Sequence, residues 1–166
     1  MNAKKNYLEN SHQPLEEKTS RNIAVVGIGN SIRSDDGIGA YICSCVDSWN
    51  LPGVTTITVQ QLHTTLIEDL LLFDGIVLAD ASIAGGPVAF YPLEEDDSGI
   101  LSSSHHINAG LLAALTRQLY NKKLPVMICA VRGENFAIGD KLSAGGLQNA
   151  TKALALIRNW VSAGVY

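Results

Sequence analysis

Residues 24–42 read AVVGIGNSIRSDDGIGAYI, and this stretch decides the fold. The β-branched, apolar run of residues 22–27 predicts a buried strand that ends in glycine. Residues 37–49 follow with helical spacing, and either Asp35 or Asp36 could cap the first turn of that helix, where a negative charge meets free N–H groups. A strand, a glycine-containing turn and a helix in direct succession indicate an α/β protein.

The strands and helices predicted along the rest of the sequence form a sheet that is covered by helices. Only six residues, 82–87, separate the third predicted strand from the fourth, too few for a crossover helix. Those two strands are therefore antiparallel, or the fourth lies at the sheet edge. The element order predicts a three-layer α/β/α sandwich with a mostly parallel, mixed five-stranded sheet. The further strands are expected at 54–60, 75–81, 88–93 and 124–133, and the further helices at 64–73, 108–120 and 145–163.

The charge and the apolar runs of the sequence argue against nucleic-acid-binding and membrane-spanning proteins. The chain has 166 residues and a formal net charge of −4 without a basic cluster, which argues against sequence-independent nucleic-acid binding. No apolar run approaches the roughly 18 residues that span a bilayer, and no secretory signal is evident, so we expect a cytoplasmic protein. Residues 1–21 are predicted to form a flexible polar tail, and residues 22–166 a single α/β domain. The three cysteines, Cys43, Cys45 and Cys129, are expected to be reduced and buried.

The glycine-rich turn fails two tests for a dinucleotide site. Ile32 stands where the G-x-G-x-x-G fingerprint has its third glycine, and Gln60 stands near the end of the second strand, where an acid would hold a ribose hydroxyl. The two aspartates at the helix start would also repel a pyrophosphate. Carboxylates at this position would attract a cation instead.

Further titratable residues follow other predicted strands. Ligands of open α/β sheets bind outside the carboxyl ends of the strands, so these residues are expected to share one edge. Two aspartates and a histidine from separate loops could bind a divalent transition metal and leave a position open for substrate or water. Taken singly, each could instead be structural, the aspartates as caps and the histidines as surface residues. The residues concerned are Asp35, Asp36, Asp80, His105, His106, Arg132 and Glu134.

The chain resembles the hydrogenase maturation proteases, endopeptidases that trim the C-terminus of the large subunit of nickel–iron hydrogenases. The family's opening motif, G-x-G-N followed by D-[DE]-x-x-G, is present as GIGNSIRSDDGIG at 27–39. Its apolar strand ending in D-A is IVLADA at 76–81, and its serine-rich approach to a histidine is SSSHHINAGLLAAL at 102–115. The similarity extends over about residues 22–160, which implies a protease domain.

The resemblance implies a set of site residues. The family's metal ligands fall on Asp36, Asp80 and His105, which would be both the metal-binding and the catalytic residues. The second acid of the D-[DE] pair is the ligand, so Asp35 would cap or orient the loop. His105 fits the register of the motif better than His106 does.

The resemblance also implies a partner and a metal. The precursor of the large subunit already holds nickel near its C-terminal cysteine motif. An open Asp-Asp-His site would bind that nickel and so position the adjacent peptide bond. The metal is therefore expected to be a divalent ion, nickel supplied by the substrate, for which zinc or cadmium could substitute in vitro. We expect a monomeric, metal-dependent endopeptidase without nucleic-acid or membrane partners.

Two alternative functions are compatible with the fold class. The first is a nucleotide-binding α/β module of the oxidoreductase type, for which the turn lacks the required residues. The second is a non-catalytic chaperone of nickel or hydrogenase with the same fold, which would bind the precursor and never cut it.

Overall fold

The computed structural model describes residues 21–93, 110, 113–114 and 116–163. The predicted N-terminal tail and the loop with His105 and His106 lie outside these residues. The described part forms a five-stranded sheet with the strand order β2-β1-β3-β5-β4. The strands are β1 (Ile23–Ile28), β2 (Val54–Val59), β3 (Gly75–Ser82), β4 (Val88–Pro92) and β5 (Val126–Arg132).

The sheet is mostly parallel, as predicted. β1 pairs in parallel with β2 and β3, and β3 pairs in parallel with β5. β4 is the antiparallel exception, and it pairs with β5 at the edge of the sheet rather than with β3. Both features that the short connection allowed are present, because β4 runs antiparallel to β3 and also lies at the sheet edge. β1 and β3 are buried along their length apart from Ser82, as the continuous apolar runs required.

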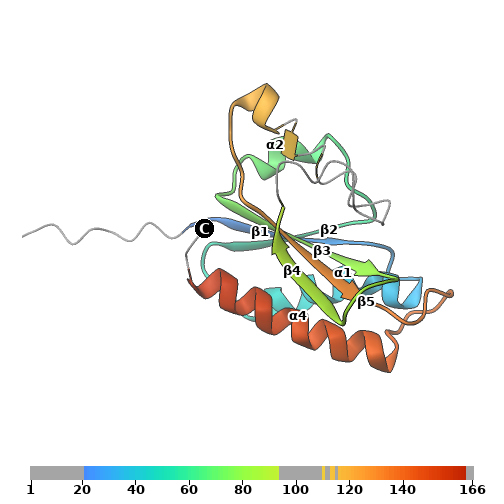
Figure 1. The fold of residues 1–166 in the computed structure, drawn as a ribbon. Helices are drawn as coiled ribbons and strands as arrows, with labels where there is room; N and C mark the ends of the chain where they lie inside the picture. Colours follow the sequence, from blue (N-terminus) through green and yellow to red (C-terminus); the bar gives the residue numbers. More distant parts are fainter. Residues whose placement is uncertain (1–20, 94–109, 111–112, 115, 164–166) are drawn as a thin grey trace, which may run out of the picture.

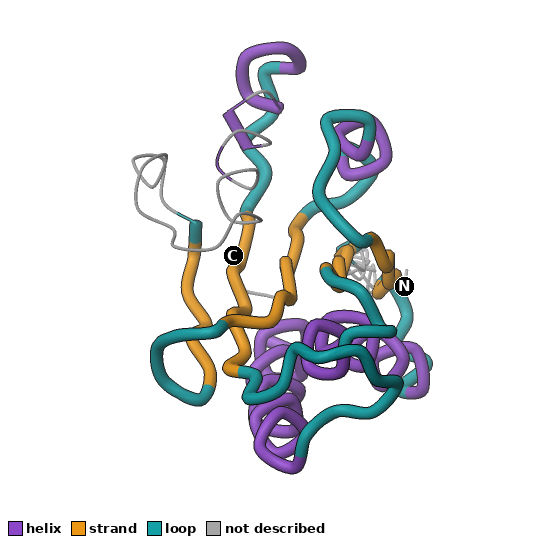
Figure 2. The backbone as a smooth tube through the Cα atoms, turned by 90° about the vertical axis from the view of Figure 1, so that its right-hand side faces the viewer, coloured by secondary structure: helices purple, strands orange, loops and turns teal. Residues whose placement is uncertain are grey.

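Helices cover both faces of the sheet (Figures 1 and 2). One face carries α1 (Ile38–Ser48) and α4 (Ala144–Ala163), whose apolar sides enclose one buried cluster. The other face carries α2 (Leu66–Leu70) and the helical residues between 110 and 120. These layers confirm the predicted three-layer sandwich. No helix in the described part of the chain has the length and apolar character needed to cross a bilayer.

β1 and α1 pack backbone to backbone. A Cβ atom on Gly27 would lie 2.2 Å from the carbonyl oxygen of Gly39, and a Cβ atom on Gly39 would lie 2.4 Å from the backbone nitrogen of Ile28. Real side chains never approach this closely, so both positions require glycine. This packing brings the start of α1 and the turn before it against the carboxyl ends of the strands.

The cysteines divide into two environments. All three are free; Cys43 and Cys129 are buried, as predicted, but Cys45 is only half-buried. The prediction was wrong for Cys45 because positions two apart on a helix point about 200° apart. Cys43 faces the sheet, where its Sγ lies 3.5 Å from the carbonyl oxygen of Val25, so Cys45 faces away.

Candidate functional site

Two of the predicted site residues, Asp36 and Asp80, lie at the carboxyl edge of the sheet. Asp80 belongs to β3 and is buried, opposite Ala130 in the register with β5. Asp36 is half-buried in a short 3₁₀ turn, η1 (Ser34–Gly37), which follows β1 and also packs against β3. Because β1 and β3 are parallel neighbours, both aspartates come to the same edge. His105, the third predicted residue, lies outside the described residues.

The Asp36 carboxylate is fixed by one hydrogen bond. Its Oδ2 accepts the backbone N–H of Asn30 at 2.9 Å, and within the described part of the chain no other donor reaches this carboxylate. Gly29 permits this arrangement, because its φ is +124° and a Cβ atom there would lie 2.0 Å from the backbone oxygen of Asp36. One carboxylate oxygen of Asp36 thus holds the turn, and the other accepts no hydrogen bond from the described residues.

Three backbone N–H groups of the turn after β1 donate hydrogen bonds within the protein. The N–H of Asn30 donates to Asp36, that of Gly29 to the Val59 carbonyl, and that of Ile32 to the Asn30 side chain. A phosphate-binding loop needs such groups aimed at its ligand. The geometry therefore disfavours the nucleotide-binding alternative, as the missing third glycine had already suggested.

Asp35 has a different role from its neighbour. Its fully buried carboxylate accepts four hydrogen bonds, from the N–H groups of Glu134 (2.6 Å), Asn135 (2.9 Å) and Ser143 (2.7 Å) and from the Ser143 hydroxyl (2.7 Å). The idea that Asp35 or Asp36 caps α1 was wrong, because Gly37 occupies the cap position without any side-chain bond. Asp35 instead orients the loop, the other role expected of it.

The Asp35 carboxylate sits at the amino end of α4. Ser143 caps that helix, since its Oγ accepts the Gly146 N–H at 2.9 Å, and a Cβ atom on Gly146 would lie 2.4 Å from Asp35 Oδ1. Burial alone raises the pKa of Asp35, but the hydrogen bonds from Ser143, Glu134 and Asn135 outweigh it, so the pKa lies below the ordinary value. A serine before Ala-Gly-Gly at the helix start was a cap signal that the sequence offered.

Two loops join into one unit at this edge. In Figure 1 the turn between β1 and α1 lies beside the loop between β5 and α4. The Ser34 N–H donates to the Gly139 carbonyl at 2.8 Å, and the Gly139 N–H donates to the Ile32 carbonyl at 3.0 Å, which makes a parallel bridge between Arg33 and Gly139. Ser34, buried and with φ +50°, is held in this shape by these contacts and by its hydroxyl bond to the Ala137 carbonyl.

Arg132 and Glu134 reach the same edge but contact other groups. Arg132 is exposed and donates from Nη1 to the Gly85 carbonyl at 3.1 Å, which ties down the loop between β3 and β4. The Glu134 carboxylate lies against Gly145, where a Cβ atom would come within 2.1 Å of its Oε1. Both residues therefore support the loops around Asp36 and Asp80.

The described residues do not form a complete metal site by themselves. Among the described residues, no three His, Cys, Asp or Glu side chains gather as a metal site. Asp36 and Asp80 contribute two carboxylates to the edge, and a third protein ligand would have to come from beyond the described residues.

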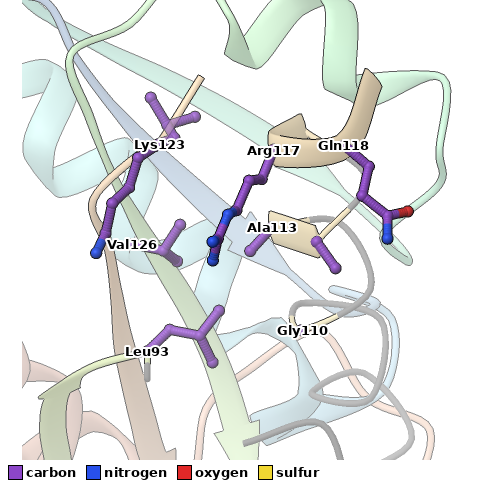
Figure 3. Close-up of a pocket in the computed structure, with 9 residues that line it drawn as sticks. Leu93, Gly110, Ala113, Arg117, Gln118, Lys123 and Val126 are labelled. Carbon is purple, nitrogen blue, oxygen red and sulfur yellow. The ribbon is translucent and has the colours of Figure 1, made fainter. Parts of the chain in front are cut away.

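A cavity of about 410 Å³ lies elsewhere, between β5 and the helical residues 110–120 (Figure 3). Val126 begins β5 and Leu93 follows the antiparallel β4, so the cavity is at the amino edge of the parallel strands. Arg117 and Lys123 are among its lining residues. It is separate from Asp36 and Asp80, which are not among its lining residues and which lie toward the carboxyl ends of β1 and β3.

The chain is similar to hydrogenase maturation proteases in sequence and in fold. No protein-family model matches it. The "Putative hydrogenase maturation protease MJ0253" of Methanocaldococcus jannaschii is 24% identical over 140 residues, which cover 81% of this chain and 90% of that protein.

Solved structures show the same fold. The hydrogenase maturating endopeptidase HybD from E. coli aligns with a TM-score of 0.73 at 18% identity, covering 86% of this chain and 94% of that one. The [NiFe] hydrogenase maturation protease HybD from Thermococcus kodakarensis aligns with a TM-score of 0.68 at 19% identity, covering 84% and 99%. The resemblance that the motifs indicated is therefore confirmed: this chain has the fold of the hydrogenase maturation proteases and is similar in sequence to a putative hydrogenase maturation protease.

Proposed function

We propose that this chain is an endopeptidase that removes a C-terminal extension from the nickel-loaded precursor of a nickel–iron hydrogenase large subunit. The names of its relatives support the maturation activity. The observation that carries the proposal is the unequal use of the aspartate pair. The Asp35 carboxylate accepts four hydrogen bonds, whereas the Asp36 carboxylate accepts one and has an oxygen available for a ligand. Asp36 and Asp80 both lie at the carboxyl edge of the sheet.

The proposed site acts on a metal that arrives with the substrate. Asp36 and Asp80, together with His105, would bind the nickel already seated in the precursor. A divalent metal there would polarise the scissile carbonyl and lower the pKa of a bound water. A precursor without nickel would offer the carboxylates nothing to bind, so cleavage would report that the metal has been inserted.

A processing assay tests this proposal. Purified chain is incubated with nickel-loaded and nickel-free precursor, and the products are weighed by mass spectrometry. We expect cleavage of the loaded precursor alone, and a loss of at least a hundredfold in rate for Asp36→Ala and Asp80→Ala. Asp69→Ala is the matched control, because Asp69 is an exposed aspartate on α2.

Three results would count against the proposal. Wild-type rates in Asp36→Ala or Asp80→Ala would show that the site is misassigned. Equal cleavage of both precursors would remove the role of nickel. Tight binding of the precursor without any cleavage would identify a chaperone instead of a protease.

A further inference from the structure

We propose that Ile32 and Ile138 form an apolar platform that holds an apolar stretch of the polypeptide substrate beside Asp36. This inference rests on the proposed function and adds a recognition surface to it. The term isoleucine platform denotes these two side chains below.

Both side chains are unusually open to solvent. Ile138 is 91% exposed and Ile32 is 63% exposed. The described residues hold one other exposed large isoleucine, Ile83, and it follows β3 directly after Ser82, on a loop at the same edge. Scattered exposed apolar residues are ordinary, but these three isoleucines lie on three loops that follow β1, β3 and β5, at the carboxyl edge that also holds Asp36 and Asp80.

The backbones of the two platform residues are neighbours. Arg33 and Gly139 form an isolated parallel bridge, and Ile32 and Ile138 each precede a bridged residue by one position. The Gly139 N–H donates to the Ile32 carbonyl at 3.0 Å, which holds the two backbone segments together.

Hydrogen bonds hold the backbone that carries the platform. It is anchored below by the buried Ser34, whose N–H donates to the Gly139 carbonyl and whose hydroxyl accepts from the Asn135 side chain. Apolar side chains on a preformed surface lose little entropy when they are covered, so more of the burial free energy appears as affinity. An exposed isoleucine pair on a backbone held in this way is suited to binding rather than to packing.

The same turn carries the platform and the candidate site. Ile32 lies between Asn30 and Asp36, and this turn is closed by the Asn30 N–H to the Asp36 carboxylate and by the Asp36 N–H to the Arg33 carbonyl. A chain that covers Ile32 would therefore contact the same hydrogen-bonded turn that holds Asp36. This continuity favours the substrate over a second copy of the protein as the occupant.

The surroundings indicate which part of a polypeptide would bind. The isoleucine side chains offer no hydrogen-bonding group, and the exposed charged neighbours Arg33, Asp140 and Lys141 are of mixed sign. Selection by charge is therefore weak here, and apolar contact area decides. The fitting occupant is an apolar segment of the precursor next to the scissile bond.

The test distinguishes an effect on substrate binding from an effect on the cleavage step. Steady-state cleavage of the nickel-loaded precursor is measured for wild type, Ile32→Ser, Ile138→Ser and the double variant. We expect KM to rise about tenfold in the double variant, with kcat within about twofold, because only apolar contact is removed. Leu72→Ser is the control, since Leu72 is 74% exposed but lies between α2 and β3, at the amino edge of the sheet.

Each outcome bears on one proposal. A double variant with an unchanged KM overturns the platform and leaves the protease proposal intact. If wild type does not cleave, the protease proposal fails, and the platform is then judged by precursor affinity in calorimetry, where equal affinities for wild type and double variant overturn it. A dimer that becomes a monomer in the double variant, measured by light scattering, overturns the platform in favour of self-association.

Discussion

Replacing Asp35 with asparagine tests the division of roles within the aspartate pair. Oδ2 accepts three of the four hydrogen bonds and Oδ1 accepts the fourth, from the Ser143 N–H. In Asp35→Asn the amide oxygen can replace Oδ2, but the amide nitrogen then faces a donor. Asparagine preserves the shape of a side chain that is packed against Gly133 and Gly146, so the change is mainly one of charge and hydrogen bonding.

The expected loss of stability follows from these bonds. Three charge-assisted bonds become neutral, at about 1 kcal/mol each, and one buried donor loses its acceptor, at about 1–3 kcal/mol. Because the bonds share one carboxylate, their contributions overlap, and we expect the free energy of unfolding to fall by about 3–5 kcal/mol in Asp35→Asn. Asp36→Asn, which disturbs a single bond on a half-buried side chain, should cost about 1 kcal/mol.

Urea unfolding followed by far-ultraviolet circular dichroism measures both variants. The slope of the transition must stay constant for the comparison to hold. A loss in Asp35→Asn no larger than that in Asp36→Asn would refute the assignment of Asp35 as the structural partner. A double-mutant cycle with Ser143→Ala adds a second criterion, because strictly additive losses would show that Asp35 and Ser143 are not coupled.

Two further predictions concern titration and thiol reactivity. The folded pKa of Asp35 lies below its ordinary value of 3.8, so the stability that the carboxylate contributes is complete above about pH 5 and is lost as pH falls through the folded pKa. The difference in unfolding free energy between wild type and Asp35→Asn should therefore be constant from pH 5 to 8 and become smaller below about pH 4. A difference that does not change with pH would contradict the lowered pKa. Burial raises the pKa of Cys129 to about 12, so about one Cys129 thiol in ten thousand is ionised at pH 8. Iodoacetamide should therefore label the half-buried Cys45 in folded protein and Cys129 only after unfolding, as detected by peptide mass spectrometry. The reverse order of labelling would show that the burial is misassigned.

The strands were predictable because their signal is local. Residues 22–27 and 75–81 were expected as buried strands, and the structure has Ile23–Ile28 and Gly75–Ser82. A strand buried on both faces must be apolar at nearly every position, so its own sequence identifies it. The place of β4 was harder to predict, because its partner β5 comes more than thirty residues later in the chain. The short connection before β4 only excludes a crossover helix between β3 and β4.

The difference between the two aspartates was not readable from their neighbours. Asp35 and Asp36 are adjacent and chemically identical, and either could have capped the helix. What separates them is a set of donors on the loop before α4, far along the chain. The resemblance selected Asp36 as the ligand, while the hydrogen bonds of Asp35 supply a physical reason for treating the two residues differently.

The bonds to Asp35 also impose an order on the assembly of the protein during translation. The turn with Asp36 leaves the ribosome early, but the donors that fix it are encoded 99 to 108 residues later. Until they emerge, the Asp35 carboxylate remains hydrated and the turn lacks its anchor. Contacts this distant in sequence close late, because the entropy of a long loop must be overcome first. A nascent chain therefore lacks the anchored turn at its sheet edge, and the geometry around Asp36 is complete only after the loop before α4 has been made.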